Sequence, residues 1–322
     1  MNTFGHNFRV TLFGESHGPA IGVVIDGVPA GIALCEADFE ADLARRRAGA
    51  VGTTPRTEED KPELLSGLYR GHTTGAPLAI IFRNRNARPE EYDNQPIPRP
   101  GHADWVAAQK YGSYNDPRGG GHFSGRLTLA LVAAGVVAKR VVGSVKFEAH
   151  ISQIGGCDNA SEWDAIIRQA SSEGDSVGGI VECRAEGVGV GVGEPFFDSL
   201  ESHIAHLLFA IPGVRGVEFG DGFGAATMRG SEHNDPIVAP DGTTAKNGAG
   251  GINGGLSNGN PIVVRVAFKP TSSIARPQQT LDPTTGEMAT LSTAGRHDVC
   301  IALRGAVVVE AAVAIALADL IG

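Results

Sequence analysis

The sequence predicts one α+β domain, and three observations support this fold class. The chain has 322 residues, which is too many for one small core and suits a large domain with insertions. Segments with strand spacing and segments with helix spacing occur in clusters, without the regular alternation of a doubly wound sheet. No stretch of linker composition divides the chain, so residues 1–322 are expected to form a single domain.

Alternating apolar residues and short apolar runs predict the strands. Phe8, Val10 and Leu12 alternate with polar neighbours, which is the spacing of a half-buried strand. Patterns of this kind predict strands at residues 8–12, 22–26, 64–69, 77–82, 145–151, 179–186, 216–219 and 262–268.

Longer periodic segments predict the helices. The helix at 36–47 has acidic residues in its first turn and arginines in its last, as the helix dipole prefers, and Gly49 is a suitable C-cap. The segment 306–321 is strongly apolar but contains Glu310 and Asp319 and is short for a membrane span, so it predicts a buried core helix. Further helices are expected at 103–111, 127–142, 162–169 and 198–209, with loops at 53–62 and 220–259.

Composition narrows the class of protein. Hydrophobic residues make up 42% and charged residues 20% of the chain, as in ordinary soluble proteins. The net charge of -9 argues against non-specific binding to nucleic acid, and no segment indicates a signal peptide or a membrane protein. The four cysteines form no C-x-x-C pair, which indicates reduced thiols in the cytoplasm and no metal site. An anionic substrate would therefore need a locally basic pocket.

The stretch 99–126 concentrates cationic and titratable side chains around three consecutive glycines. Its acids are only Asp104 and Asp116, in contrast to the acidic chain as a whole. A glycine-rich loop before a helix offers free N–H groups and the positive end of the helix dipole, so this stretch predicts an anion site. The glycines match neither a P-loop nor a dinucleotide-binding fingerprint, which leaves the type of anion open.

Three titratable residues are candidates for acid–base chemistry. His17 lies in a GESHG turn after a strand and is either a general acid or a solvent-facing turn residue. His102 follows Pro100 and Gly101 and either points into the anion site or begins a helix without a further task. Asp298 stands close to an arginine and a histidine and is either half of a structural ion pair or a base.

Two other segments have a binding and a structural interpretation. Residues 269–273 (KPTSS) follow a strand and offer one cation, several hydroxyls and backbone N–H groups, which suits a phosphate or the edge of a flavin. The same segment could be a plain strand-to-turn connection with a solvent lysine. The arginines at 45–47 are either a solvated helix end or present one or two side chains to a ligand, since three adjacent residues cannot share one face.

Taken together, these motifs closely resemble the chorismate synthase family. The matching stretches occur in family order and are residues 14–32, LARRRAG at 43–49, the RPGHADW run from 99, RGGGHFSGR at 118–126, the loop 250–259, KPTSSI at 269–274 and the GRHD motif with the helix after it. Several of these stretches are long and rare. Together they indicate the family more firmly than a single stretch would.

The resemblance implies a fold, a reaction and a set of partners. The fold would be an α+β sandwich of antiparallel sheets and helices, assembled as a homotetramer. The activity would be that of a carbon–oxygen lyase in the shikimate pathway, which removes phosphate from 5-enolpyruvylshikimate 3-phosphate in an anti-1,4-elimination and gives chorismate. The cofactor would be reduced FMN, although the reaction involves no net redox change. NADPH would matter only where an intrinsic or external reductase supplies the reduced flavin.

The resemblance also assigns roles to individual residues. His17 would protonate the leaving phosphate, His102 would keep the reduced flavin in its protonation state, and Asp298 would assist proton removal at the flavin edge. Residues implied to bind FMN are His122, Phe123, Ser124, Gly254, Lys269, Pro270, Thr271, Ser272, Ser273 and Arg296. Arg118 and Arg126 would reach the substrate anions, and Arg46 would reach either the substrate or a pyridine nucleotide.

Two departures from the family pattern matter for these roles. His122 and Phe123 replace an arginine and a serine that many relatives have beside the flavin. Gly52 stands in a shortened loop where relatives often have a further arginine, which weakens a nucleotide site and favours an external flavin reductase. Two alternatives remain, another FMN-dependent enzyme and a flavin- or phosphate-binding regulatory protein. The two histidines and Asp298 favour an enzyme over a mere binder.

Overall fold

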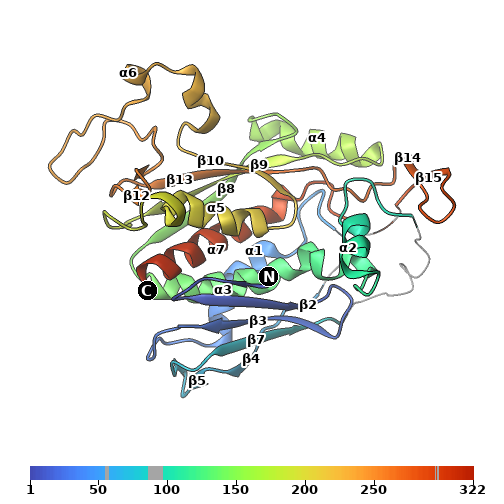
Figure 1. Cartoon of the computed structure of the whole chain (residues 1–322), viewed down its shortest axis with the longest axis horizontal. Helices are drawn as coiled ribbons and strands as arrows, with labels where there is room; N and C mark the ends of the chain where they lie inside the picture. Colours follow the sequence, from blue (N-terminus) through green and yellow to red (C-terminus); the bar gives the residue numbers. More distant parts are fainter. Residues whose placement is uncertain (55–57, 86–96, 294, 296) are drawn as a thin grey trace.

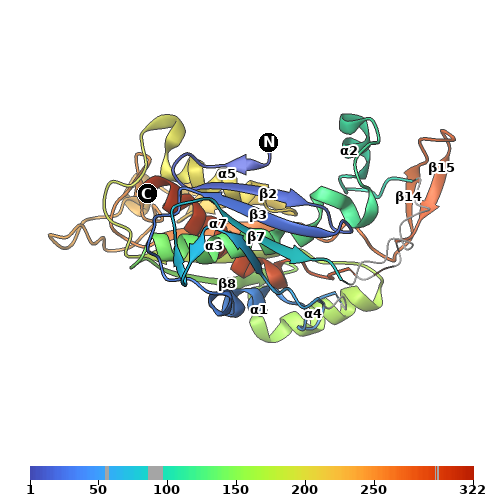
Figure 2. The same ribbon diagram turned by 90° about the horizontal axis from the view of Figure 1, so that it is seen from below.

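Two antiparallel sheets enclose a layer of helices (Figures 1 and 2). The computed structural model describes residues 1–54, 58–85, 97–293, 295 and 297–322. The first sheet has the order β1 (Thr3–Phe4), β2 (Arg9–Gly14), β3 (Ala20–Asp26), β7 (Leu78–Arg83) and β4 (Glu63–Ser66). The second has the order β10 (Val214–Phe219), β13 (Ile262–Phe268), β9 (Gly179–Glu186) and β8 (Lys146–Ile154). The expected α+β sandwich of antiparallel sheets and helices is therefore confirmed.

Two apolar helices form the centre of the sandwich. Helix α3 (Thr128–Val141) packs on the first sheet, α7 (Ala302–Ile321) packs on the second, and the two helices pack on each other. All residues from 126 to 138 and from 307 to 319 are buried, because both helices are covered on every side. The helices approach closely at Gly135, where an added Cβ would lie 2.3 Å from the Cβ of Ala311.

The remaining helices surround this pair. Helix α1 (Glu40–Arg46) contacts α3 and α7, and α5 (Leu200–Ala210) contacts α7 and β10. Helix α4 (Ala160–Ser172) packs beside β8, and α2 (Asp104–Tyr111) lies at the end of the layer where α3 and α7 begin. No helix among the described residues is long and apolar enough to span a membrane.

Strand burial follows the alternation seen in the sequence. In β13, Ile262, Val264 and Val266 are buried and the residues between them are partly exposed. The register places Val264 opposite Cys183 and Val266 opposite Val181 of β9, so both strands present one apolar face to α7. The hydrophobic core lies between the sheets and continues through the helical layer.

Acidic side chains inside this layer are paired. Glu310 of α7 accepts hydrogen bonds from Arg45 of α1 and Lys139 of α3, which connects the three helices. Near the other end of α7, Asp319 accepts the backbone N–H groups of residues 6–8 and lies 2.8 Å from a ring nitrogen of His203. These contacts explain how an apolar helix can carry two buried carboxylates.

The sequence missed several short elements and some boundaries. Helix α7 begins four residues before the predicted position, and the predicted strand 64–69 divides at Gly67 into β4 and β5 (Leu68–Tyr69), with β5 pairing β6 (His72–Thr73). The predicted loop 220–259 contains α6 (Gly230–His233), β11 (Ile252–Asn253) and β12 (Leu256–Ser257). The hairpin of β14 (Gln278–Leu281) and β15 (Met288–Leu291) is partly exposed, and its polar and apolar residues do not alternate in the sequence.

Candidate active site

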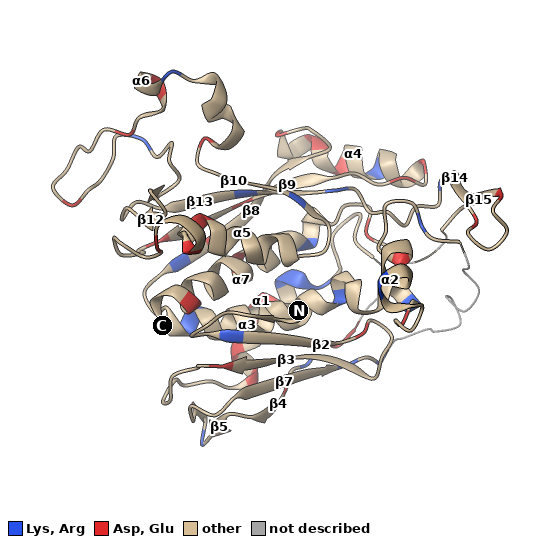
Figure 3. Cartoon of the chain, in the orientation of Figure 1, with Lys and Arg blue, Asp and Glu red and all other residues tan. Residues whose placement is uncertain are grey.

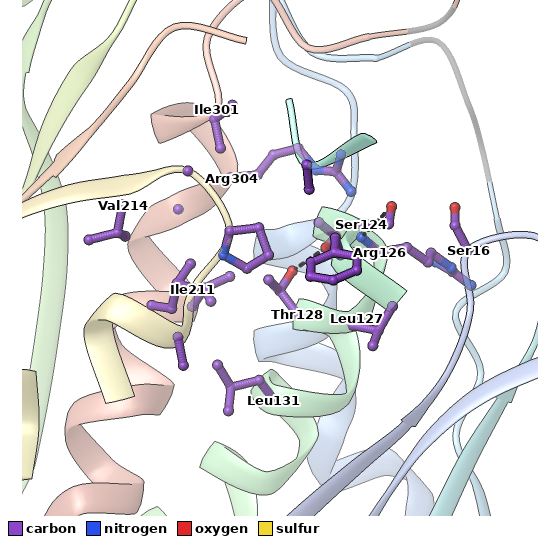
Figure 4. A pocket seen from close by; sticks show the side chains of 18 of the residues that line it. Ser16, Ser124, Arg126, Leu127, Thr128, Leu131, Ile211, Val214, Ile301 and Arg304 are labelled. Atoms are coloured by element: carbon purple, nitrogen blue, oxygen red, sulfur yellow. Dashed lines mark hydrogen bonds between the residues drawn. The ribbon is translucent and has the colours of Figure 1, made fainter. Parts of the chain in front are cut away.

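A cavity of about 930 Å³ lies at the end of the helical layer next to α2. Its walls come from the first turns of α3 and α7, the last turn of α5 and the loops that follow β2, α1 and β13. Figure 4 shows Leu131, Ile211 and Val214 on an apolar side, and Ser16 and Arg126 on a polar side. The volume is near the upper end of the range of about 300–1,000 Å³ for small-molecule sites, so there is room for two ligands in contact.

The cavity is cationic although the chain is acidic. Figure 3 shows Lys and Arg at the ends of α1, α3 and α7 that lie towards α2. The described lining residues include seven Lys or Arg and three Asp or Glu. The cations are Arg46, Arg47, Arg99, Arg126, Arg215, Lys269 and Arg304, and the acids are Glu58, Asp60 and Asp298. This balance suits a ligand with several negative charges.

The three consecutive glycines bring two histidines together. Gly119, Gly120 and Gly121 have φ angles of 58°, 85° and 52°, which side-chain-bearing residues rarely adopt. A Cβ at Gly119 would lie 2.4 Å from the ring of His17, and one at Gly120 would lie 3.2 Å from the ring of His102. The glycines therefore allow both imidazole rings to pack against successive residues of one loop.

His17 is held in place by the turn that carries it. The residue is 9% exposed and lines the cavity. The N–H of Ser16 donates to the carbonyl of Gly121 at 3.0 Å, which joins the turn to the glycine loop. Asn84 donates through Nδ2 to the carbonyls of Glu15 and Gly18 at 3.1 and 2.8 Å, and so holds both ends of the turn.

His102 is held by the partly buried ion pair between Arg99 and Asp104. Its Nδ1 lies 2.6 Å from Oδ1 of Asp104, and Arg99 donates to both oxygens of that carboxylate, at 2.7 Å from Nε and 2.8 Å from Nη2. Burial alone would raise the pKa of Asp104, but the hydrogen bonds from Arg99 and His102 hold that pKa well below its usual range. Asp104 is therefore an ionised acceptor for the histidine.

Two arginines lie almost fully buried at the cavity wall. Arg46 donates to the hydroxyl of Thr128 at 3.0 Å and to the carbonyl of Gly125 at 2.8 Å. Arg126 donates through Nε to Oδ1 of Asn84 at 3.1 Å and through Nη1 to Asp60. Nη1 of Arg46 and Nη2 of Arg126 are buried and have no hydrogen-bond partner among the described residues.

The charge at Arg46 is incompletely compensated. Burial and the neighbouring charge of Arg304 lower the pKa of Arg46, and the carboxylate of Asp60 is 4.0 Å away. A buried guanidinium with an unsatisfied N–H group is costly unless a ligand completes its hydrogen bonds. Together with Arg126, this arginine marks the place where an anionic group would be stabilised most.

Asp298 lies next to this cationic group. Its carboxylate accepts the N–H of Thr54 at 2.8 Å and forms an ion pair with Arg304 at 3.1 Å. Arg304 also donates to the backbone carbonyl of Arg46 at 2.8 Å, so one guanidinium connects Asp298 to the end of α1. Asp298 thus forms an ion pair with Arg304 of α7, whereas the arginine beside it in sequence, Arg296, lies outside the described residues.

The KPTSS segment lies against the stretch that begins at Arg99. Arg99 donates to the hydroxyl of Ser273 at 2.9 Å, and Lys269 donates to Ser272 at 2.7 Å and to the carbonyl of Gly101. Burial and the charge of Arg215 lower the pKa of Lys269. Thr271 also lines the cavity. Cations and hydroxyls from two distant parts of the sequence thus form one wall.

The structure does not bring all predicted site residues to the cavity. Pro270, Gly254 and Arg118 are not among the described residues that line it, and Arg118 forms an ion pair with Asp116 at 2.9 Å. Gly254 precedes Gly255, whose carbonyl accepts the first N–H of α5, whereas the cavity lies at the last turn of that helix. Eleven helical residues separate these ends by roughly 16 Å. Arg296 lies outside the described residues.

The altered family positions line the cavity with a different chemistry. His122, Phe123 and Ser124 are all lining residues. The ring nitrogens of His122 lie 2.8 Å from the carbonyl of Gly14 and 3.2 Å from the amide oxygen of Asn2. The side chain of Ser124 accepts the N–H of Arg126 at 3.3 Å. His122 therefore connects the glycine loop to β2 and the N-terminus, and presents its ring to the cavity.

Sequence reasoning missed several residues that shape the site. Asn84, Asp60 and Arg304 reach it from separate parts of the chain and have no local motif that identifies them. In the sequence, Asp104 stands out only as an acid in a basic stretch. Its closeness in sequence to Arg99 and His102 is the signal that could have identified it as their partner, because the three residues lie within six positions of the chain.

Comparison with known proteins gives the family. The sequence pattern of the family described as chorismate synthase matches residues 8–321. Chorismate synthases of Chitinophaga pinensis and Dehalococcoides mccartyi are 56% and 44% identical, and each match covers 99% of this chain and 96% of the relative. A crystal structure of chorismate synthase is similar with a TM-score of 0.76 at 27% identity, and the match covers 98% of this chain and 92% of that one. The chain belongs to the chorismate synthase family.

Proposed function

We propose that this chain converts 5-enolpyruvylshikimate 3-phosphate to chorismate by anti-1,4-elimination of phosphate, with reduced FMN as cofactor. This is the last shared step of aromatic amino acid biosynthesis, in the shikimate pathway. The observation that carries the proposal is the packing of His17 and His102 against successive glycines of one loop, inside a cationic cavity. A binding module without chemistry has no need for two positioned imidazoles there.

The substrate's charges account for the buried arginines. The substrate carries two carboxylates and a phosphate, and guanidinium groups bind both with paired hydrogen bonds. Arg46 and Arg126 both line the cavity, and their guanidinium groups contact the two oxygens of the same carboxylate, that of Asp60. An anion that bonds to both would restore their hydrogen bonds and offset their burial. This favours substrate binding at Arg46 over contact with a pyridine nucleotide.

His17 is placed to act as the general acid. Phosphate leaves with excess negative charge, and a proton delivered to its bridging oxygen lowers the barrier to C–O cleavage. The ring lies in a buried turn whose backbone is held by Asn84 and by the glycine loop. This support keeps the imidazole in one orientation while the substrate binds.

The remaining cavity suits a phosphorylated flavin. The glycine loop and the donors of residues 269–273 provide anion-binding groups, and the apolar side near Ile211 suits a flat ring. A reduced FMN held there would supply transient electron density to the substrate ring. His102 would hold the flavin's protonation state, and Asp298, oriented by Arg304 and Thr54, would accept the ring proton.

Exposed aromatic residues and the position of Gly254 support assembly with further subunits. Phe196 and Phe197 are 86% and 92% exposed beside the beginning of α5, which supports burial against another subunit in a homotetramer. Gly254 belongs to the same end of α5, so its contact with a flavin would require the cavity of a neighbouring subunit. The enzyme would act in the cytoplasm and receive its flavin from a separate reductase.

The proposal is tested by incubating the protein with substrate and reduced FMN in the absence of oxygen. Chorismate and phosphate are expected in equal amounts. His17→Ala is expected to lower turnover by roughly two to four orders of magnitude, the usual range for a general acid. His150→Ala, at an exposed position of β8, is the matched control and should keep full activity. Absence of chorismate with the wild-type protein, or normal turnover by His17→Ala, would contradict the proposal.

A further inference from the structure

The partly buried cluster of Arg99, Asp104 and His102 determines where the histidine carries its proton. The carboxylate of Asp104 accepts three hydrogen bonds from Arg99, from its backbone N at 3.1 Å, Nε at 2.7 Å and Nη2 at 2.8 Å. Its fourth contact is with Nδ1 of His102, at 2.6 Å. Arg99 is buried, whereas the side chains of Asp104 and His102 are 22% and 21% exposed, so the cluster is partly shielded from water.

The short contact between nitrogen and oxygen requires a proton between the two atoms. Two lone pairs would repel each other at 2.6 Å, so either Asp104 or Nδ1 carries the hydrogen. Arg99 binds both oxygens of the carboxylate and keeps it ionised, which leaves the hydrogen on Nδ1. Nη2 of Arg99 also lies 3.1 Å from Nδ1, but this guanidinium nitrogen already donates to Oδ1 of Asp104 at the shorter distance of 2.8 Å.

The opposite edge of the ring packs against Gly120 of the glycine loop. Nε2 and Cε1 of His102 are the atoms nearest to the position of a Cβ on Gly120, at 3.3 and 3.2 Å. His102 lines the cavity, whereas Asp104 is not among its described lining residues. The carboxylate of Asp104 therefore contacts the Nδ1 edge of the ring. The Nε2 edge contacts the glycine loop, whose Gly119 also packs against His17.

We propose that Asp104 and Arg99 are positioning residues that hold His102 in the Nδ1–H tautomer, so that Nε2 is the atom that exchanges a proton with the bound ligand. This inference rests on the proposed function for the identity of that ligand, but the tautomer itself does not depend on it. Arg99 also donates to Ser273, so the same guanidinium connects the dyad to the wall formed by residues 269–273. A positively charged ring would donate from Nε2, and a neutral ring would accept there.

The tautomer can be measured directly by NMR. Full-length protein with ¹⁵N-labelled histidine is examined at alkaline pH by long-range ¹H–¹⁵N correlation, without flavin or substrate. The chain has ten histidines, so the signals of His102 are identified by their loss in His102→Gln. The wild-type protein is expected to show a protonated Nδ1 and an imine-type Nε2. Asp104→Asn should convert a substantial fraction to the Nε2–H tautomer, because the amide can donate to Nδ1.

Kinetics then separate positioning from general damage to the site. Asp104→Asn is expected to lower kcat by about 10²-fold or more while KM for the substrate changes less than about threefold, since Asp104 does not touch the cavity. Asp104→Glu should restore part of kcat and the Nδ1–H signal. Asp26→Asn, which removes the acid of an exposed pair with Arg9, is the matched control and should change neither quantity.

The NMR spectra test the inference, and turnover by the wild type tests the proposed function. An Nε2–H tautomer in the wild type, or an unchanged tautomer in both Asp104 variants, would overturn the inference. A wild-type protein with the expected tautomer but no chorismate synthase activity would leave the inference standing and contradict the proposed function. A rise in KM that parallels the loss of kcat in Asp104→Asn would show a structural role and overturn the inference.

Discussion

Asn84 Oδ1 lies 3.1 Å from Nε of Arg126, and Nδ2 of the same amide donates to the carbonyls of Glu15 and Gly18 on either side of His17. One side chain thus connects the candidate general acid to a candidate substrate arginine. Asn84 itself lies just after β7, and its backbone N–H donates to the carbonyl of Pro19 at 3.1 Å. The two functional groups are therefore positioned together.

Asn84→Ala is expected to lower kcat and raise KM, each by roughly tenfold or more. A hydrogen bond to a charged group contributes about 1.5–3 kcal/mol, and about 1.4 kcal/mol corresponds to a factor of ten. Steady-state kinetics with saturating reduced FMN measure both constants. Asn159→Ser is a suitable control, because Asn159 is an exposed N-cap of α4 and serine can also cap a helix. A change in only one constant would show that Asn84 serves one group and not both.

Gly119→Ala is expected to displace the ring of His17 and to reduce turnover nearly as much as His17→Ala. The added Cβ would lie 2.4 Å from the ring, which forces the imidazole to move. Gly143→Ala controls for backbone strain, because Gly143 has a φ of 63°, close to the 58° of Gly119, and an added Cβ there meets nothing within 4 Å. Gly143→Ala should lose stability through backbone strain alone and Gly119→Ala at least as much, and both proteins should remain folded at the assay temperature, as measured by thermal unfolding. Equal turnover in the two variants would count against the contact with His17.

Asp319 is expected to make the fold sensitive to acid. Burial raises the pKa of its carboxyl, but hydrogen bonds from His203 and from the N–H groups of residues 6–8 prevail and lower that pKa to about 2. A depressed carboxyl pKa contributes stability that is fully present above the unfolded value of about 4 and is lost as pH falls through about 2. The contribution corresponds to about 2 kcal/mol in the free energy of unfolding.

This prediction is checked by urea unfolding of the wild type and Asp319→Asn between pH 5 and pH 2. The wild type should lose about 2 kcal/mol more than the variant over this interval. Asparagine keeps an oxygen that can accept the backbone N–H groups, so the variant is expected to fold. Parallel stability curves would show that Asp319 is not stabilised as a carboxylate by these contacts.

The enzyme is expected to lack flavin reductase activity of its own. Arg46 is 2% exposed, uses two of its nitrogens for Thr128 and Gly125, and has only Nη1 left, which the proposed substrate anion would occupy. Gly52 provides no cation, and an added Cβ there would lie 2.3 Å from Ile167 of α4. NADPH and oxidised FMN are supplied under argon with substrate and no other reductant. Steady formation of chorismate would prove the prediction wrong and reveal a nucleotide site.

The sequence was sufficient for the parts of the fold that depend on local pattern. The alternation in β13 is stable only as a strand with one buried face. The long apolar run of α7 is stable only as a helix covered on all sides. The hairpin of β14 and β15 has neither pattern, because its strands are four residues long, partly exposed, and mix polar and apolar residues without alternation. Local periodicity says nothing about such an element.

The site was predictable where one segment carries both the residue and its support. His102, Asp104 and Arg99 belong to one turn, and the glycines follow closely in sequence. The sequence could not select among the arginines at 45–47. It indicated only that at most one or two of them reach a ligand. Arg45 pairs with Glu310 and Arg47 with Glu40, while Arg46 is the buried one. That choice depends on where α1 meets α3 and α7, which only the tertiary structure determines.

The most direct test of the proposed reaction counts turnovers against flavin. Substrate is mixed without oxygen with enzyme and an amount of reduced FMN far below the amount of substrate, while chorismate, phosphate and flavin absorbance are followed together. An elimination without net redox change predicts many equivalents of chorismate per flavin, one phosphate per chorismate, and flavin that stays reduced. Product formation that stops at one equivalent of flavin, with the flavin oxidised, would contradict this reaction and indicate a redox enzyme built on the same cavity.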